Sequence, residues 1–127
     1  MADTTYTISA RHHVTSAGRH QLKVHATDGE LKATMTSARD YHWVVVTVGR
    51  ADRYRDRWDA KAEDYVVDVD QHLAIHVVKG TSDETVARRA FDRATWTYRG
   101  GSVAVVLFHS TLSGDYKVAQ ANRAVAS

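Results

Sequence analysis

Eight histidines are the first side chains in this sequence whose chemistry could define a site. His72 and His76 are four residues apart, and on a helix this spacing would place both imidazoles on one metal ion. The surrounding residues alternate as in a β-strand, where the two rings would stand about 13 Å apart along one face. A metal could instead be held across the first expected hairpin, by the histidines His12, His13, His20 and His25. The simpler interpretation, which we favour, is that the histidines are scattered and bind no metal.

Acidic side chains are the second group of candidates. Asp68 and Asp70 alternate onto one face of an expected strand, and two carboxylates can hold Mg²⁺ through water molecules. Glu30 and Lys32 have the E-x-K spacing found in metal-dependent nucleases, but three-residue matches recur by chance. A nuclease that uses Glu30, Lys32, Asp68 and Asp70 is therefore the most distant function considered, and we expect acids that face solvent.

Catalytic motifs of other kinds are missing from the sequence. No G-x-S-x-G elbow frames a serine nucleophile. Gly100 and Gly101 follow an expected helix instead of opening one, which is the wrong polarity for anion binding. We expect no catalytic residues, no enzymatic activity and no cofactor.

Basic side chains gather on an expected helix, at Arg88, Arg89 and Arg93. Glu84 and Asp92 stand at helical spacing from two of them and would pair with them in part. The functional interpretation is contact with DNA, RNA, a nucleotide or an acidic protein, and the structural one is a solvated helix face.

The stretch RADRYRDRWDAKAEDY, residues 50–65, holds five basic, five acidic and three aromatic side chains. At a helical period, Tyr54, Trp58 and Tyr65 share one face and the arginines are paired with acids three or four residues away. At a period of two, Arg53 and Arg55 lie with Arg57 on one face, a basic strand surface suited to phosphate.

We favour a helix over residues 51–64. The strand alternative leaves Asp56 between Tyr54 and Trp58 on the face that it must bury, which costs free energy unless the carboxylate is paired. The stretch also has no Gly or Pro to mark a hairpin turn. As a helix it would neutralise its own arginines and present Tyr54 and Trp58 to the sheet or to a partner.

The elements that position these residues are mostly strands. Alternating or β-branched runs predict strands at 4–15, 20–27, 31–36, 41–48, 102–110 and 116–120, and one or two further strands over 65–70 and 72–79. For 31–36 the alternative is a short helix from Glu30 to Arg39, and the preceding Asp28-Gly29 turn favours the strand. The run at 41–48 is almost continuously apolar, which is typical of a central strand covered on both faces. A helix is predicted at 81–96 with a T-x-x-E capping box from Thr81 to Glu84, and the last seven residues are expected to fray.

This order predicts one α+β domain, residues 1–127, with two layers: a mainly antiparallel sheet and one helix, with 51–64 as a possible second helix. One helix covers one face of a sheet. The other face would be covered by a second copy, so we expect a homodimer or larger homo-oligomer.

Composition bounds the class of protein. A chain of 127 residues with 43% hydrophobic residues can form a core and is too apolar for disorder. A net charge of +2 is modest for a nucleic-acid-binding domain. The chain has no Cys, no leader-like N-terminal pattern and no apolar run near the ~20 residues of a membrane span, so we expect a cytoplasmic protein with no membrane partner.

Three stretches, TSARDYHWVVVTVG (36–49), AIHVVKGTSDETVARRAFDRA (74–94) and GGSVAVVLF (100–108), together resemble small accessory proteins encoded by actinobacterial phages. The three stretches lie within residues 36–108, a span of just over half of the chain, and their motifs are a turn, a helix cap and a glycine stop. The resemblance implies a small accessory role in a phage-infected bacterial cell and brings no catalytic residues with it.

The leading hypothesis is therefore a non-enzymatic phage-type accessory protein that acts through protein–protein binding, with a host protein among the candidate partners. The alternative is a small nucleic-acid-binding or nucleotide-binding protein. Its candidate binding residues are Arg88, Arg89, Arg93, Arg53 and Arg55, with Tyr54 and Trp58 beside them.

Overall fold

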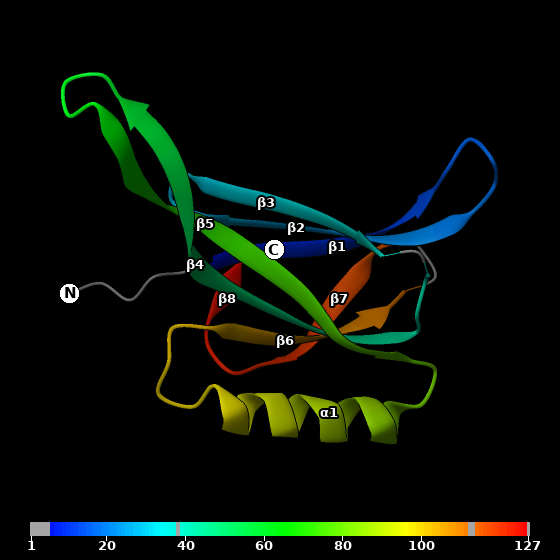
Figure 1. Ribbon diagram of the computed structural model, residues 1–127. Coiled ribbons are helices and arrows are strands. Elements are labelled where there is room, and N and C mark those ends of the chain that lie inside the picture. The colour runs from blue at the N-terminus through cyan, green and yellow to red at the C-terminus, as the bar shows by residue number, and fades with distance from the viewer. Residues whose placement is uncertain (1–5, 38, 112–113, 127) are drawn as a thin grey trace.

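The computed structural model describes residues 6–37, 39–111 and 114–126, and within them the chain forms two four-stranded sheets and one α-helix. The first sheet has the order β3-β2-β1-β8, with β1 Tyr6–Val14, β2 His20–Asp28, β3 Leu31–Ser37 and β8 Val125–Ala126. The second has the order β5-β4-β6-β7, with β4 Trp43–Asp59, β5 Asp64–Thr81, β6 Ala104–Ser110 and β7 Tyr116–Ala121. The helix, α1, is Glu84–Thr97 and lies across the outer face of the second sheet (Figure 1).

The first sheet follows directly from alternation in the sequence. Ile8 on β1 and Leu22 and Val24 on β2 are buried, while polar residues between them face outward. The predicted Asp28-Gly29 turn joins β2 to β3, with Gly29 at a positive φ of 62° that suits glycine. These strands and this turn are confirmed, apart from residues 4 and 5, which lie outside the described part of the chain.

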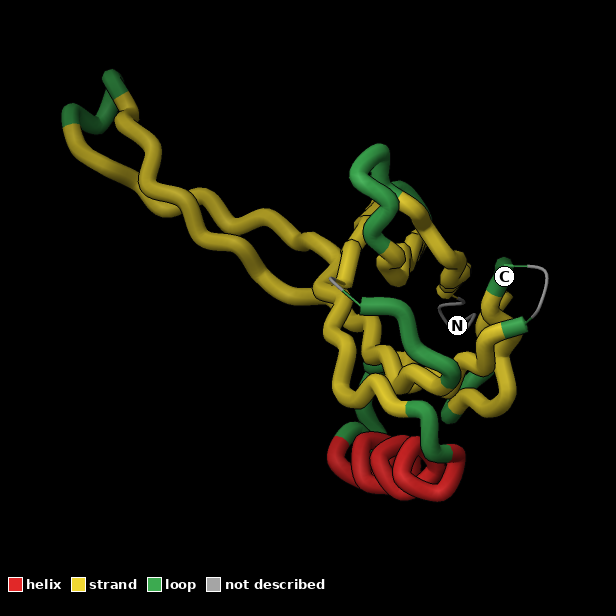
Figure 2. The backbone as a smooth tube through the Cα atoms, turned by 90° about the vertical axis from the view of Figure 1, so that its right-hand side faces the viewer, coloured by secondary structure: helices red, strands yellow, loops and turns green. Residues whose placement is uncertain are grey.

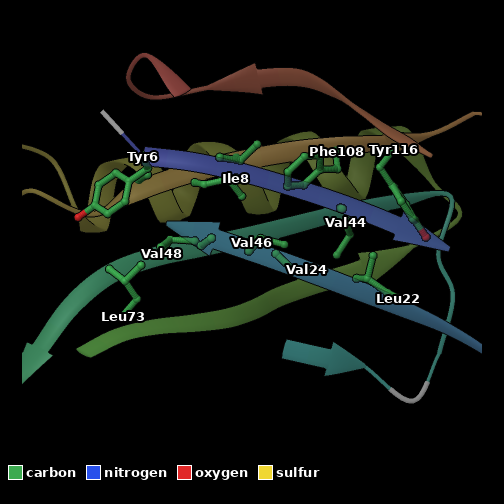
Figure 3. Close-up of a cluster of buried hydrophobic side chains, with 14 residues drawn as sticks. Tyr6, Ile8, Leu22, Val24, Val44, Val46, Val48, Leu73, Phe108 and Tyr116 are labelled. Carbon is green, nitrogen blue, oxygen red and sulfur yellow. The ribbon is translucent and has the colours of Figure 1, made fainter. Parts of the chain in front are cut away.

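The main core lies between the two sheets. A second, smaller core lies between the outer face of the second sheet and the helix α1. Val44, Val46 and Val48 of β4 point into the cluster shared with the first sheet, together with Phe108 of β6 (Figure 3). Val45 points the other way, into the cluster under α1. The prediction that residues 41–48 form a central strand covered on both faces is confirmed for β4 from Trp43 onward.

The helix begins two residues later than its predicted cap. Asp83 is the N-cap, and its carboxylate accepts hydrogen bonds from the backbone N–H of Thr85 (2.9 Å) and Val86 (3.3 Å). The predicted capping box from Thr81 to Glu84 is therefore wrong. Thr81 instead accepts a hydrogen bond from the N–H of Asp83 and holds the entry turn. On the inner side of the helix Ala87, Phe91 and Ala94 are buried against β4 and β6.

A mostly antiparallel architecture with one helix is confirmed, but the expected two layers are three. The sheet face that we expected a second copy to cover is covered by β1, β2 and β3 of the same chain. The predicted fraying of the last seven residues is also wrong over residues 121–126, because Val125 and Ala126 pair in parallel with Tyr6 and Thr7. Residue 127 lies outside the described part of the chain. Both faces of the second sheet are therefore covered within one copy, and neither requires a second copy.

The predicted helix at 51–64 is wrong as well. Strand β4 continues to Asp59, β5 starts at Asp64, and the two pair without interruption from Val46↔Val77 to Asp59↔Asp64. Beyond the sandwich they form a two-stranded ribbon that projects far from the body (Figures 1 and 2). We call residues 52–71 the arm.

Candidate functional site

The arm is a two-stranded ribbon because the rest of its sheet ends earlier. Strand β6 pairs with β4 only from Trp43 to Val48, whereas the β4–β5 pairing runs on from Asp52↔Gln71 to Asp59↔Asp64. A two-stranded hairpin standing alone in water is marginally stable. A long ribbon of this kind is expected to gain stability when a further surface covers it.

The turn at the tip of the arm, residues 60–63, uses neither glycine nor proline. The Asp59 carboxylate accepts hydrogen bonds from the backbone N–H of Lys61 (2.9 Å) and Ala62 (3.5 Å). An aspartate that bonds the backbone two residues on mimics a turn. Glu63 then takes the left-handed conformation, with a φ of 51°. These contacts explain why a search for Gly or Pro missed the hairpin.

One face of the arm is apolar and exposed. Cross-strand pairing places Tyr54 opposite Val69, and Trp58 opposite Tyr65 with their rings edge to face at 5.3 Å. Side chains directly opposite in an antiparallel pair lie on the same face. The apolar face of the arm consists of five side chains that are each 54–67% exposed: Tyr54, Trp58, Tyr65, Val67 and Val69.

Asp56 interrupts this apolar face. It stands opposite Val67 and between Tyr54 and Trp58 along β4. A helix was favoured for residues 51–64 because this face, in a strand, was expected to be buried within the chain. In the structure Asp56 is exposed, so its carboxylate keeps its water and the objection does not arise.

The other face of the arm is charged, and its arginines stand close to acidic residues of β5. Arg53 lies opposite Asp70 and Arg55 opposite Asp68, and Arg57 Nε donates to Asp68 Oδ2 at 2.8 Å. The arginines and the aromatic side chains therefore lie on opposite faces of the ribbon, as the strand alternative predicted. Its basic face, however, is matched by acids of β5, which weakens the field that would attract phosphate.

A polar belt divides the apolar face of the arm from the core. Val46, Val48 and Leu73 belong to the sandwich core and share their side of the β4–β5 ribbon with Tyr54 and Trp58. Between the two regions, Arg50 donates from Nε to the buried Asp28 carboxylate at 2.6 Å. The arm face is thus a continuation of the core face beyond the edge of the first sheet.

The three predicted basic residues of α1 separate into two environments. Arg88 donates to Glu84 (3.0 Å) and Gln120 (3.1 Å), and its guanidinium lies 5.6 Å from the Trp43 ring centre. The guanidinium groups of Arg89 and Arg93 make no ion pair or hydrogen bond with any described residue, so their charges remain free.

Arg89 and Arg93 line a groove between α1 and β5. Two adjoining cavities of about 290 and 230 Å³ share Lys79, Ala90 and Arg93 as lining residues. Their apolar lining includes Val78, Val86, Ala90 and Ala94. We call this the α1 groove. It has an apolar lining with three basic side chains, Lys79, Arg89 and Arg93.

A hydrogen-bonded cluster that the sequence did not predict lies at the end of the sandwich away from the arm. His12 Nδ1 lies 2.6 Å from Asp40 Oδ1, and His12 Nε2 lies 2.8 Å from Ser110 Oγ. This is the atom order of a Ser-His-Asp relay. The three residues come from β1, a loop and β6, so no local motif could have found them.

Several contacts favour a structural role for this cluster. Tyr116 stacks on His12, with ring centres 4.6 Å apart, and its hydroxyl bonds Asp40 and the Tyr41 backbone. Burial, and then the hydrogen bond with Asp40, raise the pKa of Tyr116. A cavity of about 210 Å³ at this end has Tyr116 in its lining but not Ser110. The cluster joins β1 to the second sheet, and the side chain that would serve as nucleophile does not line this cavity.

The other predicted sites are dispersed. In the first hairpin His20 pairs with Val14 and His25 with Ser9, so neither stands opposite His12 or His13. On β5, His72 and His76 pair with different β4 residues. Among the described residues, no group of three or more His, Asp or Glu side chains is placed to hold a metal ion.

The nuclease set is divided between elements. Glu30 lies in the turn before β3 and Lys32 lies on β3, whereas Asp68 and Asp70 lie on the arm facing arginines. Asp68 is ion-paired with Arg57.

The fold thus defines a β-sandwich with one covering helix and a projecting two-stranded arm. No family model, curated protein or solved structure matches the chain in the three comparisons made. Within the described ranges, no helix has the length and apolar character needed to cross a bilayer.

Proposed function

We propose that this protein is a non-catalytic accessory protein of the phage type that works by binding another protein through the apolar face of the arm. The observation that carries the proposal is that face itself: five large apolar side chains, all more than half exposed, on a ribbon that leaves the body. Contiguous exposed apolar surface of this kind marks interaction sites in folded proteins.

The composition of the apolar face supports a protein partner. Tyr and Trp are enriched where proteins bind one another, and Tyr54, Trp58 and Tyr65 supply three of the five side chains. The charged face of the arm would remain toward water, because its arginines already have acidic neighbours. In this proposal the protein acts in the cytoplasm of the infected cell, in keeping with its lack of cysteine.

Removing the arm tests the proposal. Replacing residues 52–71 by Asn-Gly would close the hairpin directly between Ala51 and His72, which pair in the structure. The body should keep its cooperative unfolding, while binding partners captured by the full chain from host lysate should be lost. The double variant Arg53→Gln with Asp70→Asn is the matched control, since it alters only the charged face. Capture that survives removal of the arm would contradict the proposal.

The non-catalytic part of the proposal has its own test. A fluorophosphonate probe labels serines that are activated by a histidine relay. We expect no labelling of Ser110, because Ser110 does not line the neighbouring cavity and Tyr116 bonds the same carboxylate as His12. Labelling of the wild type that disappears in both Ser110→Ala and His12→Ala would show a hydrolase instead.

Nucleic-acid binding is the second candidate, and one observation favours it. Lys79, Arg89 and Arg93 lie together and have no acidic partner among the described residues. If this cluster bound DNA or RNA, affinity would fall steeply with salt as counterions are released. Arg88→Glu with Arg89→Glu would abolish it, and Arg53→Glu with Arg55→Glu would matter less. We expect no specific mobility shift of labelled DNA or RNA at physiological salt, given a net charge of +2.

A further inference from the structure

We infer that the apolar face of the arm docks into the α1 groove of a second copy of this chain, so that copies join head to tail. The inference rests on the proposed function and names its partner. It joins two surfaces that the fold leaves unfilled: a projecting apolar ribbon and a groove with an apolar lining on the body.

The two surfaces are comparable in length. Eight residue pairs, from Asp52↔Gln71 to Asp59↔Asp64, make a ribbon roughly 27 Å long at the usual strand rise. The helix that forms one wall of the groove has 14 residues, or roughly 21 Å. The arm can therefore lie along most of the groove.

Charge complementarity favours this pairing. The apolar face of the arm carries two carboxylates beside its apolar side chains, Asp52 opposite Gln71 and Asp56 opposite Val67. The paired residues of the arm place their arginines on the opposite, charged face, where Arg57 is engaged by Asp68. The α1 groove carries Lys79, Arg89 and Arg93, and no acidic residue lines its two cavities. An acidic arm and a basic groove attract each other and align the contact.

Asp56 decides between this arrangement and the simplest alternative, in which two arms pack face to face. In a symmetric arm–arm contact, each Asp56 would be buried in an apolar interface and brought near its counterpart. Burial of an unpaired carboxylate is costly, and repulsion adds to that cost. In the α1 groove the same carboxylate meets Arg89 or Arg93. Docking in the groove pairs the charge that arm–arm packing would leave unpaired.

The arm cannot fill the groove of its own chain. Strands β4 and β5 run continuously from the sandwich to the tip and lead away from α1 (Figures 1 and 2). Each copy therefore offers one arm and one free groove. A contact between two different surfaces propagates from copy to copy and makes rings or filaments in place of a closed two-fold dimer.

Mixing two complementary variants tests this arrangement. The arm variant is Trp58→Thr with Tyr65→Thr, which removes apolar surface but keeps residues suited to a strand. The groove variant is Arg89→Glu with Arg93→Glu. We expect wild-type protein to associate beyond a dimer in sedimentation velocity as its concentration rises. Each variant alone should be monomeric, with self-association at least ten-fold weaker, and an equimolar mixture should stop at a dimer with one intact contact.

Two controls accompany the mixture. Lys32→Glu with Lys117→Glu reverses the same number of charges at exposed sites away from the groove, and it should associate like the wild type. Arg53→Gln with Asp70→Asn changes the opposite face of the arm and should also associate normally. Thermal unfolding of each variant at low concentration shows that the body remains folded.

The outcomes separate this inference from the proposed function. A groove variant that still self-associates, together with an arm variant that does not, would overturn docking in the groove and indicate arm–arm packing, while the arm would remain the binding surface. A wild-type protein that is monomeric throughout would overturn self-association, and removal of the arm in the lysate experiment would then decide the proposed function alone.

Discussion

The inner and outer halves of the β4–β5 hairpin share one backbone ladder but differ in what covers them. In the inner half, Val46 and Val48 are fully buried beneath β1 and β2. In the outer half, Val67 and Val69 lie on the same side of the ribbon and are more than half exposed. The residue types are alike, so local pattern alone does not decide burial. The length of the neighbouring sheet decides it.

Val46→Asn and Val69→Asn give the largest expected contrast between the two halves. Val46→Asn buries an amide without a partner and should lower the free energy of unfolding by about 3 kcal/mol or more. Val69→Asn should change it by no more than about 0.5 kcal/mol, because the site is exposed. Urea denaturation, at concentrations low enough to keep the chain monomeric, measures both. Equal losses would mean that the arm is as much a part of the stable core as the sandwich.

Tyr116→Phe probes the end of the sandwich away from the arm. The hydroxyl of Tyr116 bonds Asp40, lies 2.7 Å from the Tyr41 carbonyl oxygen and accepts from the Tyr41 N–H at 3.1 Å. Removing it leaves partly buried groups unpaired and should lower the free energy of unfolding by about 1–3 kcal/mol. A change as small as that of Val69→Asn would show that this end is as loosely held as the arm.

Alkaline pH should act on the body through the same tyrosine. Burial and the Asp40 hydrogen bond raise the pKa of Tyr116, so the folded chain keeps a proton that the unfolded chain loses above its ordinary pKa of 10.0. The stabilisation is complete below pH 10 and is lost as the pH rises above it. Tyr6, whose pKa is raised by burial and by Asp28, contributes in the same direction. Unfolding measured from pH 8 to 11 should show a shallower decline in Tyr116→Phe than in the wild type. An identical decline in stability in both proteins would show that Tyr116 is not its source.

Asp68→Asn on the arm should have a small effect, comparable to that of Val69→Asn. Its ion pair with Arg57 joins two side chains that are each about half exposed, and such pairs contribute about 0–1 kcal/mol. Urea denaturation should place the variant within that range. The same variant tests the nuclease alternative, for which we expect no hydrolysis of DNA or RNA with Mg²⁺ or Mn²⁺ in either protein. Hydrolysis by the wild type that Asp68→Asn abolishes would overturn the non-catalytic proposal.

The parts of the fold that could be predicted from sequence depend on local pattern. Alternation in β1 and β2, the Asp28-Gly29 turn and the Ala87, Phe91 and Ala94 stripe of α1 each arise from residues close in the chain. The pairing of strands into two sheets was not predictable in this way. Residues 39–42 precede the first strand of the second sheet and carry no motif that marks a change of sheet. A hairpin has the same sequence pattern whether the chain forms one sheet or two.

The arm was misassigned for a related reason. Its arginines have acids both along the chain and across the ribbon, so the spacing of Arg55 and Asp59 fits a helix although the structure pairs Arg55 with Asp68. Long-range pairs of this kind are invisible in a short window. The predicted residues Tyr54 and Trp58 nevertheless lie together on one exposed face. Arg89 and Arg93 lie in the groove, and Arg88 is occupied elsewhere. His12, Asp40 and Ser110 are brought together by the strand topology, so no local sequence pattern could predict their contact.

One bulged residue connects these local details to the shape of the proposed assembly. Between Val45 and Val46 the pairing skips Val78, so that Val45 stands opposite Lys79 and Val46 opposite Val77. Deleting Val78 would leave every other pair in place and restore a regular ladder, but it would remove the bend and added twist that a bulge gives a strand. The bulge lies between the arm and the start of α1, so it sets the angle between the two ends of β5. In a chain of copies that angle is repeated at each step, and a single residue would determine whether the series closes into a ring or advances as a helix.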